Sequence, residues 1–321
     1  MAVLITGGGV VGLRTAALLA ARADRVIVAD VRAVDPGDLS RDDLAIVTCD
    51  ILDRDALERL VRSQGITAIV HTAALLSTAI RRDPVRGVMV NTVGTTNVLE
   101  VARACAVRRV VIASSTTVGY TCFGTHGPDP IEEDLALRVV SQRPASLYAA
   151  TKLAAEHIAL LYSDLYGVDV AILRYGAVLS ANADVATSVP DRLLSVLLSA
   201  GRAGSTARIE DPLLVWAGRE EFVDARDCAR ANVAALDASH LHSLVYNIAN
   251  GLWYSFDDVC DVVRKIYPAL SVDLRVNVTS GFAGFPHQRP APSSITAAQA
   301  ELGFAAAYSL QDSVAYLASR P

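Results

Sequence analysis

The chain has 321 residues, of which 52% are hydrophobic and 20% are charged. This composition is typical of a globular protein with a well-buried core, and it excludes a disordered chain. The formal net charge of -5 gives no basic footprint for nucleic acid, and no basic amphipathic run favours a membrane surface. The length suits one large α/β unit or two closely joined domains.

The N-terminus and the cysteines indicate the compartment. The first apolar run, 3–5, is short and leads directly into glycines, so no signal peptide is predicted, and no uncharged apolar run approaches membrane-spanning length. The five cysteines are odd in number and scattered, without a C-x-x-C pair. This usage predicts a reduced, cytoplasmic protein, and the spacing of Cys and His predicts no metal site.

Short β-branched runs alternate with longer amphipathic runs in the first half of the chain. The predicted strands are 3–6, 25–31, 45–49, 68–71, 109–114 and 168–173. The predicted helices are 13–23, 55–64, 85–106 and 147–166, and Asp83-Pro84 and Gly167 are start and stop signals for the last two. Strands this apolar are usually buried on both faces, so we expect an α/β fold with a Rossmann-type, doubly wound parallel sheet.

The alternation weakens beyond residue 174. Helices are predicted at 190–200, 256–267, 297–302 and 310–318, a strand and then a helix within 222–236, and a strand at 245–249. Residues 281–292 are rich in Gly and Pro and should be irregular. The loop from 116 to 146 is unusually long for a compact domain, which is typical of a functional loop.

A glycine-rich turn, 6–12, joins the first strand to the first helix. Gly7, Gly9 and Gly12 satisfy G-x-G-x-x-G, in which the glycines allow a tight turn, close approach of a pyrophosphate, and close helix packing. Val10 and Val11 then lie at the helix N-terminus, where backbone N–H groups face an anion. A glycine-rich turn can be only a turn, but the strand–turn–helix context predicts a nucleotide site.

Asp30 ends the second strand about 20 residues after the glycines, where a carboxylate can accept hydrogen bonds from ribose hydroxyls. It would repel a 2′-phosphate, so NAD is favoured over NADP, although Arg32, two residues on, could accommodate a phosphate. After the third strand, Asp50 could bind the adenine amino group or cap the next helix, a role that suits Asp53 better.

Polar or small residues also end the next two strands. Thr72, Ala73 and Ala74 would let a cofactor lie against the backbone, and His71 is interpreted as structural. Ser114, Ser115, Thr116 and Thr117 place hydroxyls at the carboxyl end of a strand, where ligands bind or where they could simply satisfy a turn.

Tyr148 and Lys152 lie four residues apart and so project from one face of the predicted helix. An ammonium about 4 Å from a phenol favours the phenolate by roughly 4 kcal/mol at an effective dielectric of 20. A phenol whose pKa is lowered in this way can accept the proton of an alcohol while hydride leaves the same carbon. The expected reaction is therefore the oxidation of a secondary alcohol.

In this order, the glycine turn, Asp30, the serine cluster and Tyr-x-x-x-Lys resemble the extended short-chain dehydrogenase/reductases. More narrowly, the chain is similar to the NAD-dependent epimerase/dehydratase family over essentially its whole length. Further segments that match family motifs are 90–95, 173–175, 221–227 and 246–249.

The resemblance implies that Tyr148 is the general acid/base, that Lys152 holds the nicotinamide ribose and lowers the tyrosine pKa, and that Ser115 steadies the reacting oxygen. The residues expected to bind NAD are Gly7, Gly9, Val10, Val11, Gly12, Asp30, Val31, Arg32, Asp50, Ile51, Thr72, Ala73, Ala74, Asn91, Ser114, Tyr148, Lys152 and Tyr175. The residues expected to bind substrate are Leu76, Ser77, Ser115, Thr116, Thr117, Arg174 and Gly176. The expected domains are an NAD-binding domain, 1–175 with 221–249 returning to it, and a smaller, mainly substrate-binding domain, 176–321.

Some positions depart from the family pattern. The glycine turn is one residue shorter, the stretch 173–179 lacks the asparagine and Gly-Pro that commonly help hold a nucleotide-sugar, and Glu220 stands where an arginine is expected. The segment 73–77 is reminiscent of the threonine dehydrogenases, the small-substrate branch.

Three functions follow, in this order of preference. The first is a nucleotide-sugar epimerase, in which hydride returns to the substrate. The second is a net dehydrogenase of a small hydroxy acid, amino acid or sugar, in which NADH leaves. The third is an NAD-binding regulator without catalysis. Helices 85–106 and 147–166 are expected to form a homodimer interface by analogy, although their apolar faces could equally be intramolecular core.

Overall fold

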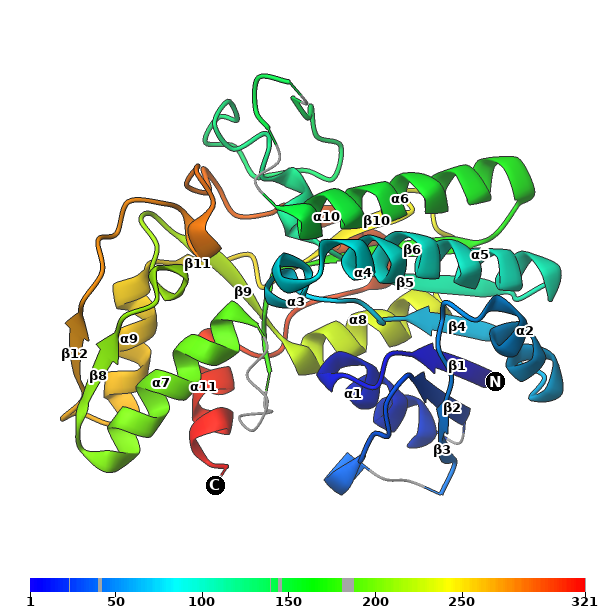
Figure 1. Ribbon diagram of the computed structural model, residues 1–321, viewed down its shortest axis with the longest axis horizontal. Coiled ribbons are helices and arrows are strands. Elements are labelled where there is room, and N and C mark those ends of the chain that lie inside the picture. The colour runs from blue at the N-terminus through cyan, green and yellow to red at the C-terminus, as the bar shows by residue number, and fades with distance from the viewer. Residues whose placement is uncertain (23, 40–41, 139, 144–145, 181–187, 321) are drawn as a thin grey trace.

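The computed structural model describes every residue except 23, 40–41, 139, 144–145, 181–187 and 321 (Figure 1). Its largest element is a seven-stranded parallel sheet in the order β10-β6-β5-β4-β1-β2-β3. These strands are β1 (Ala2–Thr6), β2 (Arg25–Asp30), β3 (Leu44–Thr48), β4 (Ala68–His71), β5 (Arg109–Ser115), β6 (Val170–Tyr175) and β10 (Val245–Ile248). The predicted Rossmann-type sheet is therefore confirmed.

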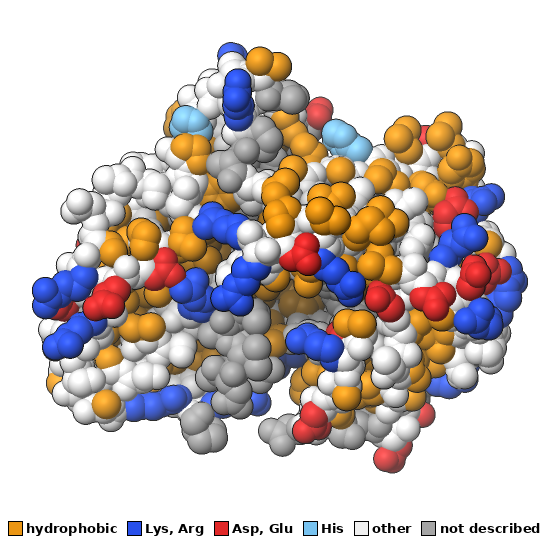
Figure 2. Space-filling view, viewed as in Figure 1, with side chains coloured by type: hydrophobic (Ala, Val, Ile, Leu, Met, Phe, Trp, Pro, Cys, Tyr) orange, Lys and Arg blue, Asp and Glu red, His pale blue; other side chains and the backbone are white. Residues whose placement is uncertain are grey.

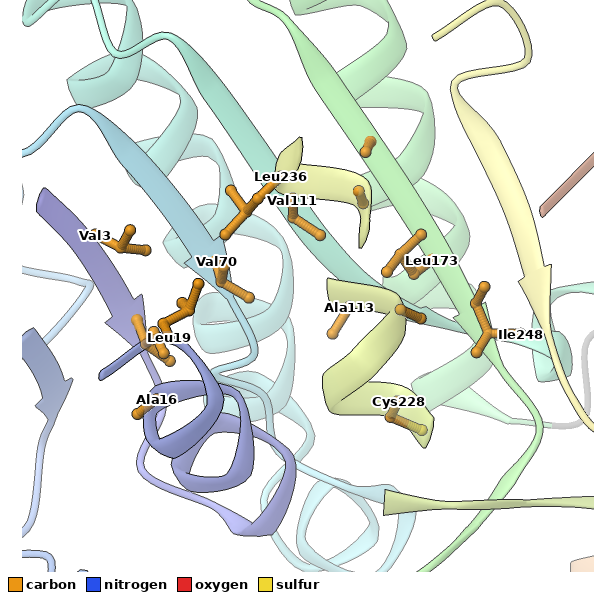
Figure 3. Close-up of a cluster of buried hydrophobic side chains, with 14 of the residues drawn as sticks. Val3, Ala16, Leu19, Val70, Val111, Ala113, Leu173, Cys228, Leu236 and Ile248 are labelled. Atoms are coloured by element: carbon orange, nitrogen blue, oxygen red, sulfur yellow. The ribbon is translucent and has the colours of Figure 1, made fainter. Parts of the chain in front are cut away.

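Helices cover both faces of this sheet. On one face lie α1 (Val10–Ala20) and α8 (Ala225–Asp237), which pack on alternate strand residues such as Val70, Val111 and Leu173 (Figure 3). On the other face lie α2 (Arg54–Ser63), α5 (Thr95–Ala104) and α6 (Leu147–Tyr166). The strands are apolar throughout because both of their faces are buried, as a covered parallel sheet requires.

The helix predicted at 85–106 is divided. The helix α4 (Pro84–Val88) continues through a π-helical segment, η2 (Met89–Gly94), into α5, and a short α3 (Ser77–Arg82), which was not predicted, precedes it. Asp83 begins α4 as expected, since its carboxylate accepts from the N–H of Arg86 at 3.0 Å. π-Helical segments are frequent at functional sites, and this one carries Asn91.

A second group of elements follows the sixth strand. It contains a three-stranded sheet of β7 (Ala177–Leu179), β9 (Glu220–Asp224) and β11 (Trp253–Tyr254), and a pair, β8 (Thr206–Ile209) with β12 (Ser271–Leu274). The helices α7 (Val189–Ala203), α9 (Phe256–Ile266) and α11 (Leu310–Ala318) share a hydrophobic core with them, whereas α10 (Thr296–Leu302) packs on the large sheet. Sequence patterns missed β7, β8, β11 and β12, which have two to four residues each.

The long loop 116–146 starts with a 3₁₀ turn, η3 (Thr116–Gly119), directly after β5. Its residue Ile131 forms a backbone bridge with Ser293, and its side chains Tyr120 and Phe123 pack against Phe285. The loop is thereby joined to the segment 285–293, next to the carboxyl end of the sheet. No helix in the described ranges is long and apolar enough to cross a membrane.

The prediction that Asp53, and not Asp50, caps α2 can be tested by mutation. Asp53 accepts a hydrogen bond from the N–H of Ala56 at 2.9 Å. Asp53→Ala should therefore lower the free energy of unfolding by about 1 kcal/mol, measured by urea denaturation. Asp42→Ala, which removes an exposed turn carboxylate, is the control; an equal loss in both variants would contradict the cap.

Candidate functional site

The glycine turn between β1 and α1 has the shape of a phosphate cradle. Gly7 has a φ of 99°, and a Cβ there would lie 2.6 Å from the backbone N of Ala73. A Cβ on Gly12 would lie 2.0 Å from the carbonyl oxygen of Gly7. By contrast, the Cβ direction of exposed Gly9 meets nothing within 4 Å, and no side chain caps α1. The N–H groups that begin α1, at Val10 and Val11, therefore face open space suited to an anion.

Asp30 braces this turn from the end of β2. Its carboxylate accepts from the N–H of Gly8 at 2.8 Å and from the N–H of Arg32 at 3.0 Å. Val31 is exposed, and the side chain of Arg32 is 81% exposed. Asp30 thus lies beside the turn, at the place where a ribose would follow the pyrophosphate.

The end of β4 supports the same turn. Thr72 donates to the carbonyl oxygens of Thr6 and Gly7, both at 3.0 Å, so its hydroxyl braces the backbone. Ala73 and Ala74, which follow, are half-buried.

His71 lies within 2.6 Å of the Thr6 hydroxyl and 2.9 Å of the Thr95 hydroxyl through its two ring nitrogens. Burial, and then the charge of Lys152, lower its pKa to about 3. The imidazole is therefore neutral and has the contacts of a structural residue, which agrees with its interpretation from the sequence.

The two aspartates in the segment after β3 have different hydrogen-bond partners. Asp50 accepts from the N–H of Leu52 at 2.9 Å and keeps its other oxygen 3.7 Å from Arg86, while Asp53 caps α2. The side chain of Ile51 is buried in the core against Gly94. Ile51 can thus offer a cofactor only its backbone.

The predicted catalytic residues come from β5 and α6, which pack against each other. Ser115 ends β5, and Tyr148 and Lys152 lie in the first two turns of α6. Lys152 Nζ donates to the carbonyl oxygen of Ala113 at 2.8 Å and lies 6.0 Å from the centre of the Tyr148 ring. The structure therefore brings these three side chains to the carboxyl edge of the sheet.

The electrostatics differ from the expectation based on helical spacing. Burial raises the pKa of Tyr148 to about 12, although a hydrogen bond with Ser115 works to lower it. Burial lowers the pKa of Lys152 to about 8, against the favourable charge of Glu156. The ammonium lies 6.0 Å from the centre of the ring, and in the free chain burial and Ser115 are the influences on the pKa of Tyr148, so the lowering by Lys152 stays a prediction for the enzyme with NAD bound.

Asn91 joins the loop after β4 to the catalytic helix. Its amide accepts from the N–H of Leu75 at 2.7 Å and donates to the Leu75 carbonyl oxygen at 3.0 Å and to the Thr151 hydroxyl at 3.1 Å. Because Thr151 precedes Lys152, Asn91 also helps to position the catalytic helix, and its predicted contact with NAD stays a prediction. The side chain of Tyr175 is directed into the core, where it donates to Asn232 at 2.7 Å.

Two other predicted ligands, Ser114 and Arg174, form a hydrogen bond and an ion pair with Glu156, which sequence patterns did not single out. The hydroxyl of Ser114 donates to Glu156, and Arg174 forms an ion pair with the same carboxylate at 2.7 Å. Arg174 also donates to the carbonyl oxygen of Glu133 at 2.7 Å. A substrate would therefore have to compete with Glu156 for Arg174. The available signal was the spacing of Glu156, four residues beyond Lys152.

The remaining predicted substrate ligands surround the end of β5. Thr116 is buried, and the hydroxyl oxygen of Thr117 is buried with no hydrogen-bond partner among the described residues. Leu76 and Ser77 are half-buried where α3 begins, and Gly176 is buried beside Glu221.

A family model described as "NAD dependent epimerase/dehydratase family" matches residues 3–249. The chain belongs to this family. It is thus an NAD-dependent epimerase/dehydratase or dehydrogenase of the extended short-chain type, and NAD is its cofactor. The open Gly9 cradle, the uncapped start of α1 and Asp30 fit that cofactor.

Relatives of this family member fall into two groups. The chain is 30% identical over 283 residues to the mitochondrial L-threonine 3-dehydrogenase of Bos taurus, covering 86% of this chain and 71% of the relative. It is 26% identical to a putative UDP-glucose 4-epimerase of Methanocaldococcus jannaschii, covering 82% and 81%. The crystal structure of L-threonine dehydrogenase from Phytophthora infestans matches with a TM-score of 0.79 and 26% identity, covering 99% and 98%.

At Gly9 in the phosphate cradle, a substitution should weaken NAD binding with little effect on the stability of the protein. Gly9→Ala should change the free energy of unfolding of the free enzyme by at most about 1 kcal/mol, because Gly9 has ordinary φ and ψ and open space. The same methyl group would occupy the pyrophosphate position, so NAD should bind at least about tenfold more weakly, measured by calorimetry. Gly12→Ala, the comparison, should lose both stability and binding. Unchanged NAD affinity in Gly9→Ala would contradict the cradle.

Buried His71 predicts acid sensitivity. Its unfolded pKa is about 6.5 and its folded pKa about 3, so between these values the unfolded chain binds one more proton. Stability should fall by about 1.4 kcal/mol per pH unit from this group as pH drops below 6.5, with no contribution above it. His71→Gln should show a correspondingly shallower pH slope in urea denaturation between pH 6 and 4. Parallel slopes for the two proteins would refute this role.

Proposed function

We propose that this enzyme is a net NAD-dependent dehydrogenase of a small β-hydroxy amino acid, with L-threonine the first substrate to test. The proposal keeps the reaction type predicted from Tyr148 and Lys152 and changes the order of preference among substrates. The supporting observation is that the guanidinium of Arg289 forms ion pairs with Glu220 and Glu221, next to Gly176.

Arg289 is 1% exposed in its side chain. Its Nε lies 3.0 Å from a carboxyl oxygen of Glu220, its Nη2 donates to Glu221, and its guanidinium lies 5.1 Å from the centre of the Phe123 ring. Burial raises the pKa of Glu220, although Arg289 opposes this, so the carboxyl group closest to Nε is costly to ionise. Glu221 forms a second ion pair with the same guanidinium.

This cluster borders the substrate side of the sheet. A Cβ on Gly176 would lie 3.4 Å from Cγ of Glu221, and the Tyr120 hydroxyl, five residues beyond Ser115, donates to Glu220 at 3.0 Å. A diphosphate would need a cation here, but Arg289 is already paired, and Glu220 occupies the position where the family pattern has an arginine. A nucleotide-sugar would therefore be bound poorly, whereas a small amino acid needs no cation for a diphosphate at this place.

The proposed chemistry uses the residues at the end of β5 and the start of α6. As phenolate, Tyr148 takes the proton of the substrate hydroxyl, and the Ser115 hydroxyl donates a hydrogen bond to the same oxygen as it becomes a carbonyl. Lys152, as ammonium, favours the phenolate once it leaves its contact with Ala113. Bound NAD supplies the acceptor for the hydride that leaves the carbinol carbon. The products are a ketone, NADH and one proton.

Similarity supports the same choice. The bovine relative at 30% identity is a threonine dehydrogenase, and the segment 73–77 resembles that branch. The epimerase remains the second candidate because the archaeal relative is described as a putative UDP-glucose 4-epimerase and matches over 82% of this chain.

The homodimer expected by analogy stays a proposal, supported by exposed hydrophobic side chains that gather over α4 and α6 in Figure 2. They belong to Val85, Val88, Met89, Val93, Leu147, Leu161, Leu165 and Tyr166. A soluble surface seldom groups so many large apolar side chains on neighbouring helices unless they are covered.

The proposal is tested with L-threonine as substrate and with a variant that lacks the Tyr148 hydroxyl. With NAD and L-threonine the enzyme should release NADH stoichiometrically, and Tyr148→Phe should lower kcat by roughly 10²- to 10⁴-fold while NAD still binds. Tyr162→Phe, on the same helix but bonded to Glu100, is the matched control and should retain activity.

Two other results would replace the proposal. Interconversion of UDP-sugars without release of NADH would establish the epimerase. Activity in cells that is indifferent to Tyr148→Phe would favour the regulator.

A further inference from the structure

The catalytic face of α6 extends one turn beyond the Tyr-Lys pair. Tyr148, Lys152 and Glu156 follow one another at spacings of four, which places them on a single face of the helix. The side chain of Glu156 is 2% exposed, although a carboxylate is rarely buried unless it is paired. We infer that Glu156 is a positioning residue that holds Lys152 cationic and seated against β5, with Arg174 as its counter-ion.

Glu156 and Lys152 bind consecutive residues of the same strand. Lys152 Nζ donates to the carbonyl oxygen of Ala113 at 2.8 Å, and the Ser114 hydroxyl donates to a carboxyl oxygen of Glu156. The hydroxyl of the next residue, Ser115, forms the hydrogen bond that works to lower the pKa of Tyr148. This sequence of contacts sets the rotation and the height of α6 on the sheet, so Glu156 controls where the Lys152 ammonium lies.

Arg174 connects this carboxylate to the loop 116–146 through Glu133. Its Nε and Nη2 lie 3.0 Å and 2.7 Å from Glu156, and its Nη1 donates to the carbonyl oxygen of Glu133 at 2.7 Å. The Glu133 carboxylate in turn accepts from the N–H of Asn247 at 2.7 Å. Ser114, Arg174 and Asn247 are aligned across β5, β6 and β10, so one row of polar groups ties α6 to the loop.

The charges around Lys152 explain why a carboxylate is needed. The side chain is buried, which disfavours the ammonium. The titratable groups near it are Tyr148 and Glu156 on α6, His71 on β4, and Arg174 on β6 beyond Glu156, while η2 contributes the uncharged Asn91. The pKa of Lys152 is lowered to about 8 by burial, and Glu156 is the group that opposes the decrease.

The inference rests on the proposed role of Lys152 in catalysis, but its direct test needs neither substrate nor cofactor. The chain contains only two lysines, at 152 and 265. In protein labelled with ¹³C-lysine, the two side-chain signals can be followed against pH by NMR, and Lys265→Arg assigns them. The measured quantity is the titration midpoint of Lys152.

Two variants, of which Glu156→Gln is isosteric, shift this midpoint in opposite directions. Glu156→Gln keeps an acceptor for Ser114 but removes the negative charge, so the midpoint should fall by about one pH unit or more. Arg174→Gln leaves the carboxylate without its counter-ion, so the midpoint should rise. Either variant alone decides the question if the other fails to fold.

Asp169→Asn is the control for general destabilisation. Asp169 accepts from Arg109 at 2.7 Å near the other end of β5, so its loss also breaks an ion pair on this sheet. The Lys152 midpoint should not change in this variant. A midpoint that stays at the wild-type value in folded Glu156→Gln or Arg174→Gln, or that moves equally in Asp169→Asn, would overturn the inference.

The activity profile supplies the second readout. Above the midpoint the ammonium is lost, so the alkaline limb of kcat against pH should move to lower pH in Glu156→Gln, in the same direction as the NMR midpoint. An alkaline limb that stays in place while the NMR midpoint moves would refute the catalytic part of the inference. If no hydroxy amino acid is oxidised by the wild-type enzyme, the proposed function fails, whereas the NMR midpoints still decide the role of Glu156.

Discussion

The contact between α6 and the end of β5 is the interaction on which the site depends. Three consecutive strand residues meet three helix residues at spacings of four. The side chain of Ala113 points to the opposite face of the sheet, towards α8 (Figure 3), so Lys152 uses its carbonyl oxygen, whereas Ser114 turns its hydroxyl to Glu156. Because these contacts join backbone and buried charge, the helix can neither rotate nor slide without breaking several of them.

The cofactor end of the site obeys a different constraint, which is the absence of side-chain atoms. The turn brings Gly7 against Ala73 and Gly12 against Gly7 so closely that neither could carry a Cβ, while the space beyond Gly9 stays open. Asp30 holds this arrangement through the N–H of Gly8. The two ends meet along the carboxyl edge of the parallel sheet, which is where ligands bind in doubly wound folds.

Features with local causes could be predicted from the sequence. The apolar strands, the glycine turn, the Asp53 cap and the stop at Gly167, with a φ of 69°, each depend on a few neighbouring residues. Long-range pairs could not be predicted. Arg174 reads as a substrate ligand in the sequence, yet it pairs with Glu156 and with Glu133, which lies 41 residues away along the chain.

The pKa values of the catalytic residues could not be predicted from the sequence either. Helical spacing predicted a lowered pKa for the phenol, but burial raises the pKa of Tyr148 to about 12 against the hydrogen bond with Ser115, and it lowers the pKa of Lys152 to about 8 against the charge of Glu156. Burial depends on the packing of β4, β5, η2 and α6 together, which no local pattern contains. The π-helical segment between α4 and α5, which carries Asn91, was not predicted either, and Gly94 at its end packs against Ile51.

A crystal structure of the enzyme with NAD and a hydroxy amino acid tests the account most directly. We expect the pyrophosphate over Gly9, Lys152 moved from Ala113 to the nicotinamide ribose, and the Tyr148 oxygen about 3 Å from the substrate hydroxyl. A dinucleotide seated elsewhere, or a phenol directed away from it into the protein interior, would contradict the account.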